Sequence, residues 1–403
     1  MRTNFHIGVN VHNGLWGPIK QDQAFASYAS LGMTSLRQPI MWSWVEKQKG
    51  QFIYGPELTN MDKYIRGAKA NGIETLLLLC YGNGFYDGGG MPLSVEAQDA
   101  FARYAGFVAT HFKGVVKRYE VWNEWSNGMG SRGLVTRGDP VAYARLLVKV
   151  RIALKAVDPE ILVVGGAIAH FDTVWSRQLF NAGALASMDV YSIHPYNFPD
   201  IPENAILWLD SLQTSTKLIN GGRELPFYIS EMGWPNHLAT NGISPSLAAD
   251  YLARFYLLAP MYSFIKGAWW YDYVDDGTDP NSVQHNFGLH RADYSAKPAA
   301  CAMGEIGKLF AANKPVSMQR YESGLWVAKY TNGTSFTYAV WLQAPGATLR
   351  ATVGSAGPAG AIISARGICK DTGATGNGST AVTVTLTNSP ILFATTGSWV
   401  SIQ

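Results

Sequence analysis

The chain has 403 residues, of which 47% are hydrophobic and 15% charged, so it can bury a large core as two domains or as one large barrel with an appendage. The net charge is only +3 and the Lys and Arg residues are scattered, which argues against the basic stripe that nucleic-acid binding requires. No segment approaches roughly 18 consecutive apolar residues, so we expect no membrane span.

Short β-rich segments alternate with longer amphipathic segments, a pattern typical of repeated βα units around a parallel sheet. The predicted strands are Ile7–His12, Ser35–Pro39, Glu74–Cys80, Arg118–Asn123, Leu162–Gly166, Val190–His194, Phe227–Glu231 and Ala268–Asp272. The helix patterns are Gln21–Leu31, Leu58–Asn71, Ser94–Phe112, Asp139–Val157, Val174–Ala184, Ile206–Gly221 and Pro245–Pro260. Eight such strands predict an α/β fold, a (β/α)₈ TIM barrel. A doubly wound open sheet is the alternative, but the first strand lacks the Gly-rich phosphate turn that favours it.

The helical period disappears beyond Asn313-Lys314-Pro315, and β-rich segments follow at short spacing. They are Leu325–Thr331, Ser335–Gln343, Thr348–Val353, Ala361–Arg366, Ala381–Leu386 and Pro390–Thr395, and Asn332-Gly333 is a strong hairpin signal. We therefore predict a catalytic barrel over residues 1–312 and a C-terminal β-sandwich over residues 313–403. The sandwich is expected to pack against the barrel and stabilise it, with sugar binding as the alternative.

Three cysteines, Cys80, Cys301 and Cys369, stand far apart and show no C-x-x-C spacing. Their odd number and wide separation indicate neither a disulfide framework nor a zinc site. We expect three buried thiols.

Polar residues that follow barrel strands are the candidates for chemistry, because the carboxyl ends of the strands converge on one face. This rule selects His12, Arg37, Asn83, Asn123, Glu124, His194, Tyr196, Glu231 and Trp270 or Asp272.

Two glutamates in this set share the same setting. Glu124 follows Asn123 at the end of the fourth strand, and Glu231 ends the seventh, 107 positions later. Strands four and seven lie on opposite sides of an eight-stranded ring, so these side chains can face each other. Retaining glycoside hydrolysis needs two carboxyl groups about 5–5.5 Å apart, one to donate a proton and one to attack the anomeric carbon.

An ordered set of motifs carries a family resemblance: Arg37, Trp122-Asn123-Glu124, His194-Pro195-Tyr196, Ser230-Glu231 and Trp269-Trp270. Over residues 1 to about 312, this set resembles the clan A glycoside hydrolases, which are retaining enzymes on (β/α)₈ barrels. The sandwich and the Trp-Asn-Glu-Trp motif are most similar to family 39, with family 5 second. The resemblance implies that Glu124 is the acid/base and Glu231 the nucleophile.

The neighbours of each glutamate suggest how its charge is controlled. Desolvation by Trp122 and Trp125 is expected to raise the pKa of Glu124 and keep it protonated. Arg37 and the hydroxyl of Tyr196 are expected to hold Glu231 ionised.

The remaining candidates are assigned to substrate. Asn123 is expected to bond the sugar 2-hydroxyl, and His194 to orient Tyr196 or a sugar hydroxyl. His12 and Asn83 are further candidates. Aromatic residues in the predicted loops supply stacking platforms: Trp125, Trp234 and Trp270, and also Trp16, Trp42, Trp44, Tyr81, Phe85, Tyr86, Tyr271 and Tyr273. Several platforms favour a groove and cleavage within a chain.

The predicted function is that of a retaining endo-β-glycosidase acting on a polysaccharide, with a bacterial exopolysaccharide as one candidate. An exo-acting β-xylosidase-like enzyme and an inactive carbohydrate-binding barrel are the alternatives. No metal-binding or cofactor motif stands out, since Asp275-Asp276-Gly277-Thr278-Asp279 matches a calcium loop only weakly. We expect a monomer that works in the extracellular or periplasmic space, its export signal being absent from this sequence.

Overall fold

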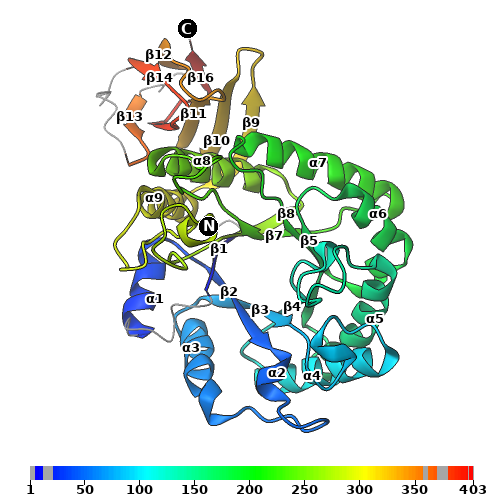
Figure 1. Cartoon of the computed structure of the whole chain (residues 1–403). Helices are drawn as coiled ribbons and strands as arrows, with labels where there is room; N and C mark the ends of the chain where they lie inside the picture. The colour runs from blue at the N-terminus through cyan, green and yellow to red at the C-terminus, as the bar shows by residue number, and fades with distance from the viewer. Residues whose placement is uncertain (1–4, 12–20, 357–361, 370–379, 398, 403) are drawn as a thin grey trace.

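Eight parallel strands close into a barrel at the centre of the molecule (Figure 1). The computed structural model describes residues 5–11, 21–356, 362–369, 380–397 and 399–402. The barrel strands are β1 (His6–Asn10), β2 (Ser35–Met41), β3 (Glu74–Cys80), β4 (Arg118–Val121), β5 (Leu162–Ala169), β6 (Val190–His194), β7 (Phe227–Met232) and β8 (Ile265–Trp270). They pair in sequence order, and β1 pairs with β8 to close the ring. All eight predicted barrel strands are present, and the TIM-barrel prediction is confirmed.

Helices surround the barrel and follow the strands in turn (Figure 1). They are α1 (Gln21–Ser30), α3 (Thr59–Ala70), α4 (Val95–His111), α5 (Pro140–Val157), α6 (Thr173–Asn181), α7 (Pro202–Ile219), α8 (Pro245–Leu258) and α9 (Pro298–Ala312), with a single turn, α2 (Trp42–Val45), after β2. Their starts follow standard capping chemistry: the side chains of Ser94, Asp139 and Ser244 accept backbone N–H groups of the first turn. The helix α9 was not predicted, although buried residues such as Ala299, Met303 and Ile306 recur at helical spacing along one face.

Inside the barrel, the large side chain of Trp269 packs against a glycine on the neighbouring strand. Trp269 on β8 is fully buried, and its indole N–H donates to the hydroxyl of Ser35 at 3.1 Å. Gly8 on the neighbouring strand leaves room for this ring, since a Cβ at position 8 would lie 2.2 Å from Trp269 Cδ1. The strands β1, β2 and β8 are thereby fixed close together in this part of the barrel.

The C-terminal residues form two antiparallel sheets, as expected for a β-sandwich. One sheet has the order β13-β15-β11-β10-β9 and the other β14-β12-β16. The strands are β9 (Lys314–Arg320), β10 (Leu325–Thr331), β11 (Phe336–Leu342), β12 (Leu349–Ala356), β13 (Ile362–Gly367), β14 (Ala381–Leu386), β15 (Ile391–Thr395) and β16 (Trp399–Ile402). The strands β9 and β16 are additions to the predicted set.

The sandwich packs on α7 and α8 through buried and hydrogen-bonded residues. Tyr330 and Trp341 belong to the same hydrophobic cluster as the barrel helices. The hydroxyl of Tyr330 donates to the carbonyl of Leu257 at 2.6 Å, and the indole of Trp341 donates to Glu203 at 2.8 Å. Glu203 is also paired with Arg254, and both are fully buried. The expected packing of sandwich against barrel is present.

The cysteines correct one prediction. Cys301 on α9 and Cys369 after β13 form a disulfide with a Cα–Cα distance of 6.1 Å. Their separation of 68 positions gives no local motif, and only the docking of the sandwich on α9 brings them together. Cys80 is a buried thiol as expected, and burial raises its pKa to about 12. Within the described part of the chain, no helix combines the length and apolar character of a membrane span.

Candidate active site

The loop after β4 places Glu124 in an unusual backbone conformation. Trp122 has a φ of +70° and Glu124 a φ of +46°, on either side of Asn123. Residues other than glycine adopt positive φ rarely, and such strain concentrates at functional sites. A short 3₁₀ turn, Trp125–Asn127, follows directly, and the backbone N–H groups of Asn127 and Met129 donate to the Glu124 carbonyl at 3.3 Å each. The turn therefore fixes the backbone position from which the Glu124 side chain extends.

Glu231, at the end of β7, is held by a cation and a hydroxyl. Arg37 Nη1 lies 2.5 Å from Glu231 Oε1, and the hydroxyl of Tyr196 donates to Glu231 Oε2 at 2.9 Å. Both contacts were expected from the sequence. Arg37 also reaches Asn123 Oδ1 at 2.8 Å, so the two strand ends are joined through one guanidinium.

Arg37 has a second carboxylate partner inside the barrel. Its Nε lies 2.5 Å from Glu120, which is fully buried. Burial by itself lowers the pKa of Arg37, but the charges of Glu120 and Glu231 outweigh burial and raise it above its ordinary value. The guanidinium is therefore a permanent charge beside Glu231.

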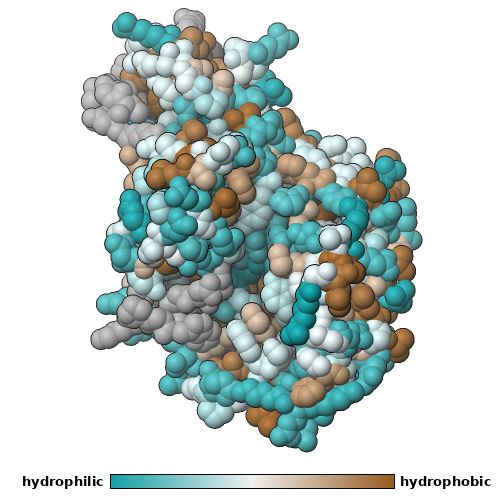
Figure 2. Space-filling view, in the orientation of Figure 1, coloured by the Kyte–Doolittle hydropathy of each residue, from teal (hydrophilic) through white to brown (hydrophobic). Residues whose placement is uncertain are grey.

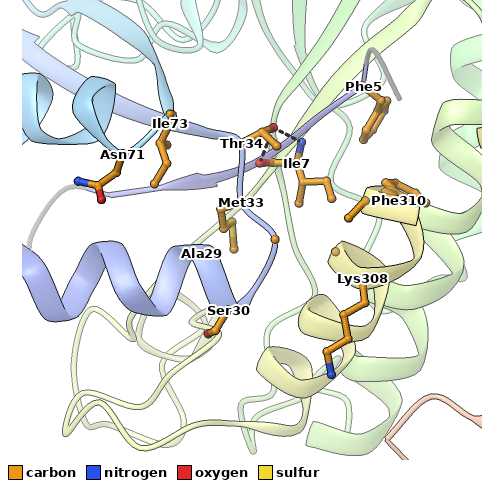
Figure 3. Close-up of a pocket in the computed structure, with 14 residues that line it drawn as sticks. Phe5, Ile7, Ala29, Ser30, Met33, Thr34, Asn71, Ile73, Lys308 and Phe310 are labelled. Carbon is orange, nitrogen blue, oxygen red and sulfur yellow. Dashed lines mark hydrogen bonds between the residues drawn. The ribbon is translucent and has the colours of Figure 1, made fainter. Parts of the chain in front are cut away.

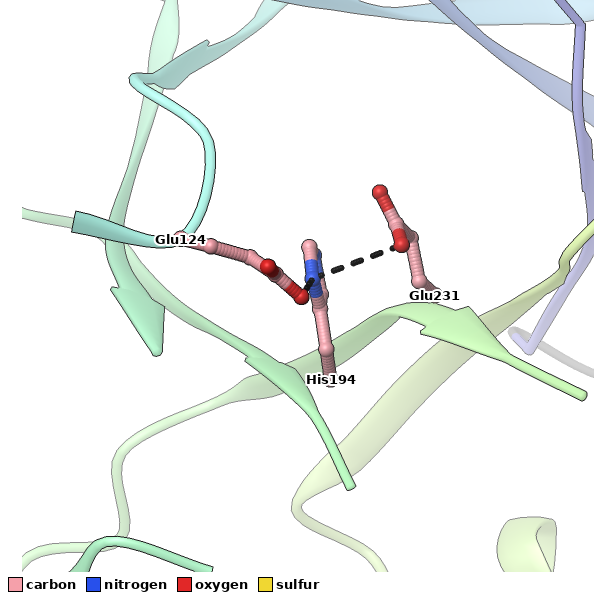
Figure 4. Close-up of side chains that lie close together, drawn as sticks. All are labelled: Glu124, His194 and Glu231. Carbon is pink, nitrogen blue, oxygen red and sulfur yellow. Dashed lines mark hydrogen bonds and ion pairs between the residues drawn. The ribbon is translucent and has the colours of Figure 1, made fainter. Parts of the chain in front are cut away.

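His194, at the end of β6, lies between the two glutamates (Figure 4). Its Nδ1 is 3.1 Å from Glu124 Oε1 and 3.5 Å from Glu231 Oε2, and its Nε2 is 3.1 Å from the hydroxyl of Ser230. The sequence had suggested that His194 orients Tyr196 or a sugar hydroxyl. The Tyr196 hydroxyl bonds Glu231, and the Tyr196 and His194 rings pack edge to face at 6.4 Å.

The protonation of Glu124 differs from the expectation. Burial raises the pKa of Glu124, but the hydrogen bond and charge of His194, with smaller contributions from Asn127 and His170, outweigh burial and lower it. Conversely, burial lowers the pKa of His194, but Glu231 and Glu124 outweigh burial and raise it above 6.5. The prediction of a raised Glu124 pKa was wrong because a histidine 70 positions away faces the carboxyl group.

The indoles next to Glu124 in the sequence belong to the core instead. The Trp122 indole donates to the carbonyl of Met129 at 2.9 Å, and the Trp125 indole to that of Asp139 at 3.0 Å. Both side chains are 0% exposed. Trp125 therefore offers no free face to a sugar.

Other expected substrate contacts are likewise buried. Trp234 and Trp270 are each 1% exposed, with indole N–H groups bonded to backbone carbonyls. Asn83 is buried, donates to the carbonyl of Glu46 at 2.8 Å and accepts from the N–H of Phe85 at 3.1 Å. Their burial gives these three predictions no support, since loop aromatics and amides can pack inward as well as face the solvent.

Some predicted aromatic residues keep accessible surface, and some lie outside the description. Trp44, Tyr81 and Tyr271 are half-buried and Phe85 is exposed, whereas Trp42, Tyr86 and Tyr273 are buried. His12 and Trp16 lie outside the described residues.

Sequence reasoning missed three polar residues of the site. Asn10 accepts from Arg37 at 2.9 Å and donates to the carbonyl of Ser230 at 3.0 Å. Glu120 binds Arg37, and Asn127 binds Glu124 at 3.1 Å. Glu120 carried a usable signal, because a carboxylate inside an apolar strand must find a buried partner.

The three groups Glu124, His194 and Glu231 could also hold a cation, since one ligand atom from each lies within 4.8 Å of the others. Two observations oppose this. Arg37 already forms an ion pair with Glu231. The raised pKa of His194 favours its protonated form, which cannot ligate a metal. The short distances between these three side chains also allow them to share a proton.

Two hollows differ in their surroundings. The space-filling view shows a hollow near the middle of one face, with mostly pale and hydrophilic surface around it (Figure 2). A separate cavity of about 440 Å³ lies at the amino ends of β1 and β2, against α9 (Figure 3). Its lining includes Ile7, Met33 and Phe310 and none of the residues around the glutamates. The amino-terminal end of a TIM barrel typically contributes to stability, whereas catalytic residues lie at the carboxyl ends of the strands.

No protein-family model matches the sequence, and no curated protein matches it. Solved structures do resemble it. A family 39 glycoside hydrolase from the gut symbiont Bacteroides cellulosilyticus WH2 superposes with a TM-score of 0.80 at 22% identity, over 98% of this chain and 81% of that one. A monomeric β-xylosidase from Caulobacter crescentus CB15 gives 0.66 at 15% identity, over 99% and 98% of the two chains. A family 30 endoxylanase from Clostridium papyrosolvens C71 gives 0.65 at 14%, over 98% and 97%. The expected likeness to family 39 is confirmed at the level of the fold.

Proposed function

We propose that the protein is a retaining β-glycosidase, with Glu231 as nucleophile and Glu124 as acid/base. The observation that carries this proposal is the meeting of the two carboxyl groups on either side of His194, with one oxygen of each within 4.8 Å of the other. A short carboxyl separation is typical of double displacement, whereas inverting enzymes leave room for a water molecule at about 6.5–9.5 Å. The fold shared with glycoside hydrolases adds support by analogy.

In the proposed reaction, each protonation state of Glu124 serves one half-reaction. In the first half, Glu231 attacks the anomeric carbon while the bond to the leaving oxygen breaks, and that oxygen takes a proton from Glu124. In the second half, Glu124 takes a proton from water, the water oxygen bonds to the anomeric carbon, and the electrons of the broken bond return to Glu231.

The proton for the first half comes from the pair of Glu124 and His194. The pKa of His194 is raised and that of Glu124 lowered, and both shifts favour an ionised Glu124 beside a protonated His194 in the free site. The gap of 3.1 Å between Nδ1 and Oε1 is short enough for transfer to Glu124 when the leaving oxygen arrives.

Cleavage within a polysaccharide chain remains part of the proposal. Its support is the set of accessible aromatics, Tyr81, Phe85 and Tyr271, in the loops after β3 and β8. Exo action of the β-xylosidase kind is the second candidate, favoured by the fold shared with a β-xylosidase. The products separate the two: a ladder of oligosaccharides indicates endo action, and immediate release of monosaccharide indicates exo action.

An extracellular or periplasmic location is also proposed. The disulfide between Cys301 and Cys369 supports it, because disulfides persist in oxidising compartments. The protein is proposed to act as a monomer.

The proposal is tested with a panel of β-linked polysaccharides and aryl β-glycosides. We expect the wild-type chain to hydrolyse at least one member, and Glu231→Gln to lose about 10⁴-fold or more of that activity. Glu224→Gln is the matched control, since Glu224 is a partly exposed carboxylate on the segment leading to β7 and pairs with Lys217 at 2.9 Å. Equal activity in Glu231→Gln and Glu224→Gln would refute the assignment. If the correctly folded wild-type chain binds a sugar of the panel without hydrolysing any, the inactive-barrel alternative replaces it.

A further inference from the structure

The 3₁₀ turn that follows Glu124 places one of its own side chains against the Glu124 carboxyl group. Asn127, the last residue of that turn, donates from Nδ2 to Glu124 Oε2 at 3.1 Å. The other oxygen, Oε1, faces His194 Nδ1 at 3.1 Å. Each oxygen of Glu124 therefore has a different nitrogen beside it, one on the same loop and one on β6.

The orientation of the Asn127 amide is fixed by its second contact. Its Oδ1 accepts the backbone N–H of Met129 at 3.3 Å, an N–H that it shares with the Glu124 carbonyl. A backbone N–H can only donate, so turning the amide over would set two donors against each other at Met129. The NH₂ group is thereby directed at Glu124, as a donor that stabilises a carboxylate and cannot accept the proton of a carboxylic acid.

We propose that Asn127 is a positioning residue for the acid/base: it orients the Glu124 carboxylate and stabilises its ionised form, the form that must take a proton from water in the second half of the reaction. This inference rests on the proposed function. Asn127 needs no contact with the sugar, because it acts through Glu124. Asn127 binds Oε2 of Glu124, and His194 lies beside Oε1. On this proposal, Oε1 is the oxygen that gives and takes the proton.

Other groups also face Glu124, and they differ from Asn127 in kind. His194 on β6 and His170 after β5 favour the carboxylate by charge, and Glu231 on β7 lies across from it. The part of this influence that is due to charge requires the protonated imidazolium form. The amide of Asn127 carries no charge, so its donation persists at every pH at which the turn is folded.

The test is an NMR titration of the full-length protein labelled with ¹³C at glutamate side-chain carboxyl groups, with Glu124→Gln used to assign the Glu124 signal. We expect Asn127→Ala to raise the titration midpoint of Glu124 by about 0.5–1 pH unit, within the normal spread of carboxyl pKa values. Asn127→Asp, which keeps the shape but removes the donor and adds a like charge, should raise it further. Asn71→Ala, which removes an exposed amide near the opposite cavity, should leave the midpoint unchanged.

Kinetics supply a second readout. With an aryl glycoside whose hydrolysis is limited by the second half-reaction, the acidic limb of kcat should move to higher pH, in the same direction as the midpoint. An unchanged Glu124 midpoint in both Asn127→Ala and Asn127→Asp would overturn the inference. The proposed function fails separately, if Glu124→Gln or Glu231→Gln retains normal hydrolysis.

Discussion

The two glutamates of the site are held by different kinds of partner. Glu231 has a permanent cation, Arg37, and the hydroxyl of Tyr196. Glu124 has His194, whose pKa its carboxylate neighbours raise, and the neutral amide of Asn127. A carboxylate with a fixed positive neighbour stays ionised, whereas one that shares a proton with a histidine can both give and take it. These different partners explain how Glu231 can act as the nucleophile and Glu124 as the acid/base on the same face of the barrel.

The sharpest test of this difference is Glu124→Ala. We expect a loss of about 10²–10⁴-fold with substrates whose leaving groups need protonation, since general acid catalysis contributes that much. The first half-reaction should be nearly unaffected with a strongly activated aryl glycoside. Added azide should restore turnover and give a glycosyl azide of β configuration, because it enters from the face that Glu124 vacates. Equal losses for both kinds of substrate would show that Glu124 is not the acid.

Arg37→Met should disrupt the Glu231 half of the comparison and the fold together. It leaves buried carboxylates at Glu120 and Glu231 without their cation, which costs about 3–5 kcal/mol of unfolding free energy for a buried pair. Chemical denaturation measures this. Lys308→Met, which removes a mostly exposed partner of Glu305, is the control and should cost at most about 1 kcal/mol. Similar losses in the two variants would remove Arg37 as the fixed charge of the site.

Tyr196→Phe should have a smaller effect. The variant removes one hydroxyl that donates to Glu231 at 2.9 Å, and a hydrogen bond to a charged group is worth about 1.5–3 kcal/mol. We expect kcat/KM to fall roughly 10- to 100-fold, while the stability changes little. Tyr262→Phe, on the loop before β8, serves as the control. A Tyr196→Phe enzyme with full activity would show that Arg37 alone holds Glu231.

The smallest effect concerns pH. The folded pKa of His194 is raised, so its charged form contributes stability that is fully present below its ordinary value of 6.5 and is lost as the pH rises through the folded pKa. The difference in unfolding free energy between the wild type and His194→Gln should therefore shrink as the pH rises above 6.5. A difference that stays constant or grows over this range would mean that His194 is neutral in the free site.

The fold was predictable because its signals are local and repeated. The bounds of β3 and β6 match their predictions, and the Asn332-Gly333 turn joins β10 to β11 as its residues indicate. The strand β8 lies earlier than predicted, ending at Trp270, because the apolar residues on both sides of that point suit a strand equally well.

The site was predictable only in part. The meeting of Glu124 and Glu231 follows from the convergence of strand ends, which the spacing of the βα units already implies. The pKa of Glu124 does not follow, since it depends on the direction of the His194 ring. Trp234 shows the same limit: its ring packs against Tyr251 and Phe255 in the core, although its place after a strand predicted a sugar platform.

Trapping the covalent intermediate tests the central claim most directly. A 2-deoxy-2-fluoro glycoside of the preferred sugar, with an activated leaving group, should form a long-lived adduct, which peptide mass spectrometry locates. We predict one sugar per chain, attached to Glu231, the carboxylate beside Arg37. An adduct on Glu124 or on any other carboxylate would contradict the division of roles between the two glutamates.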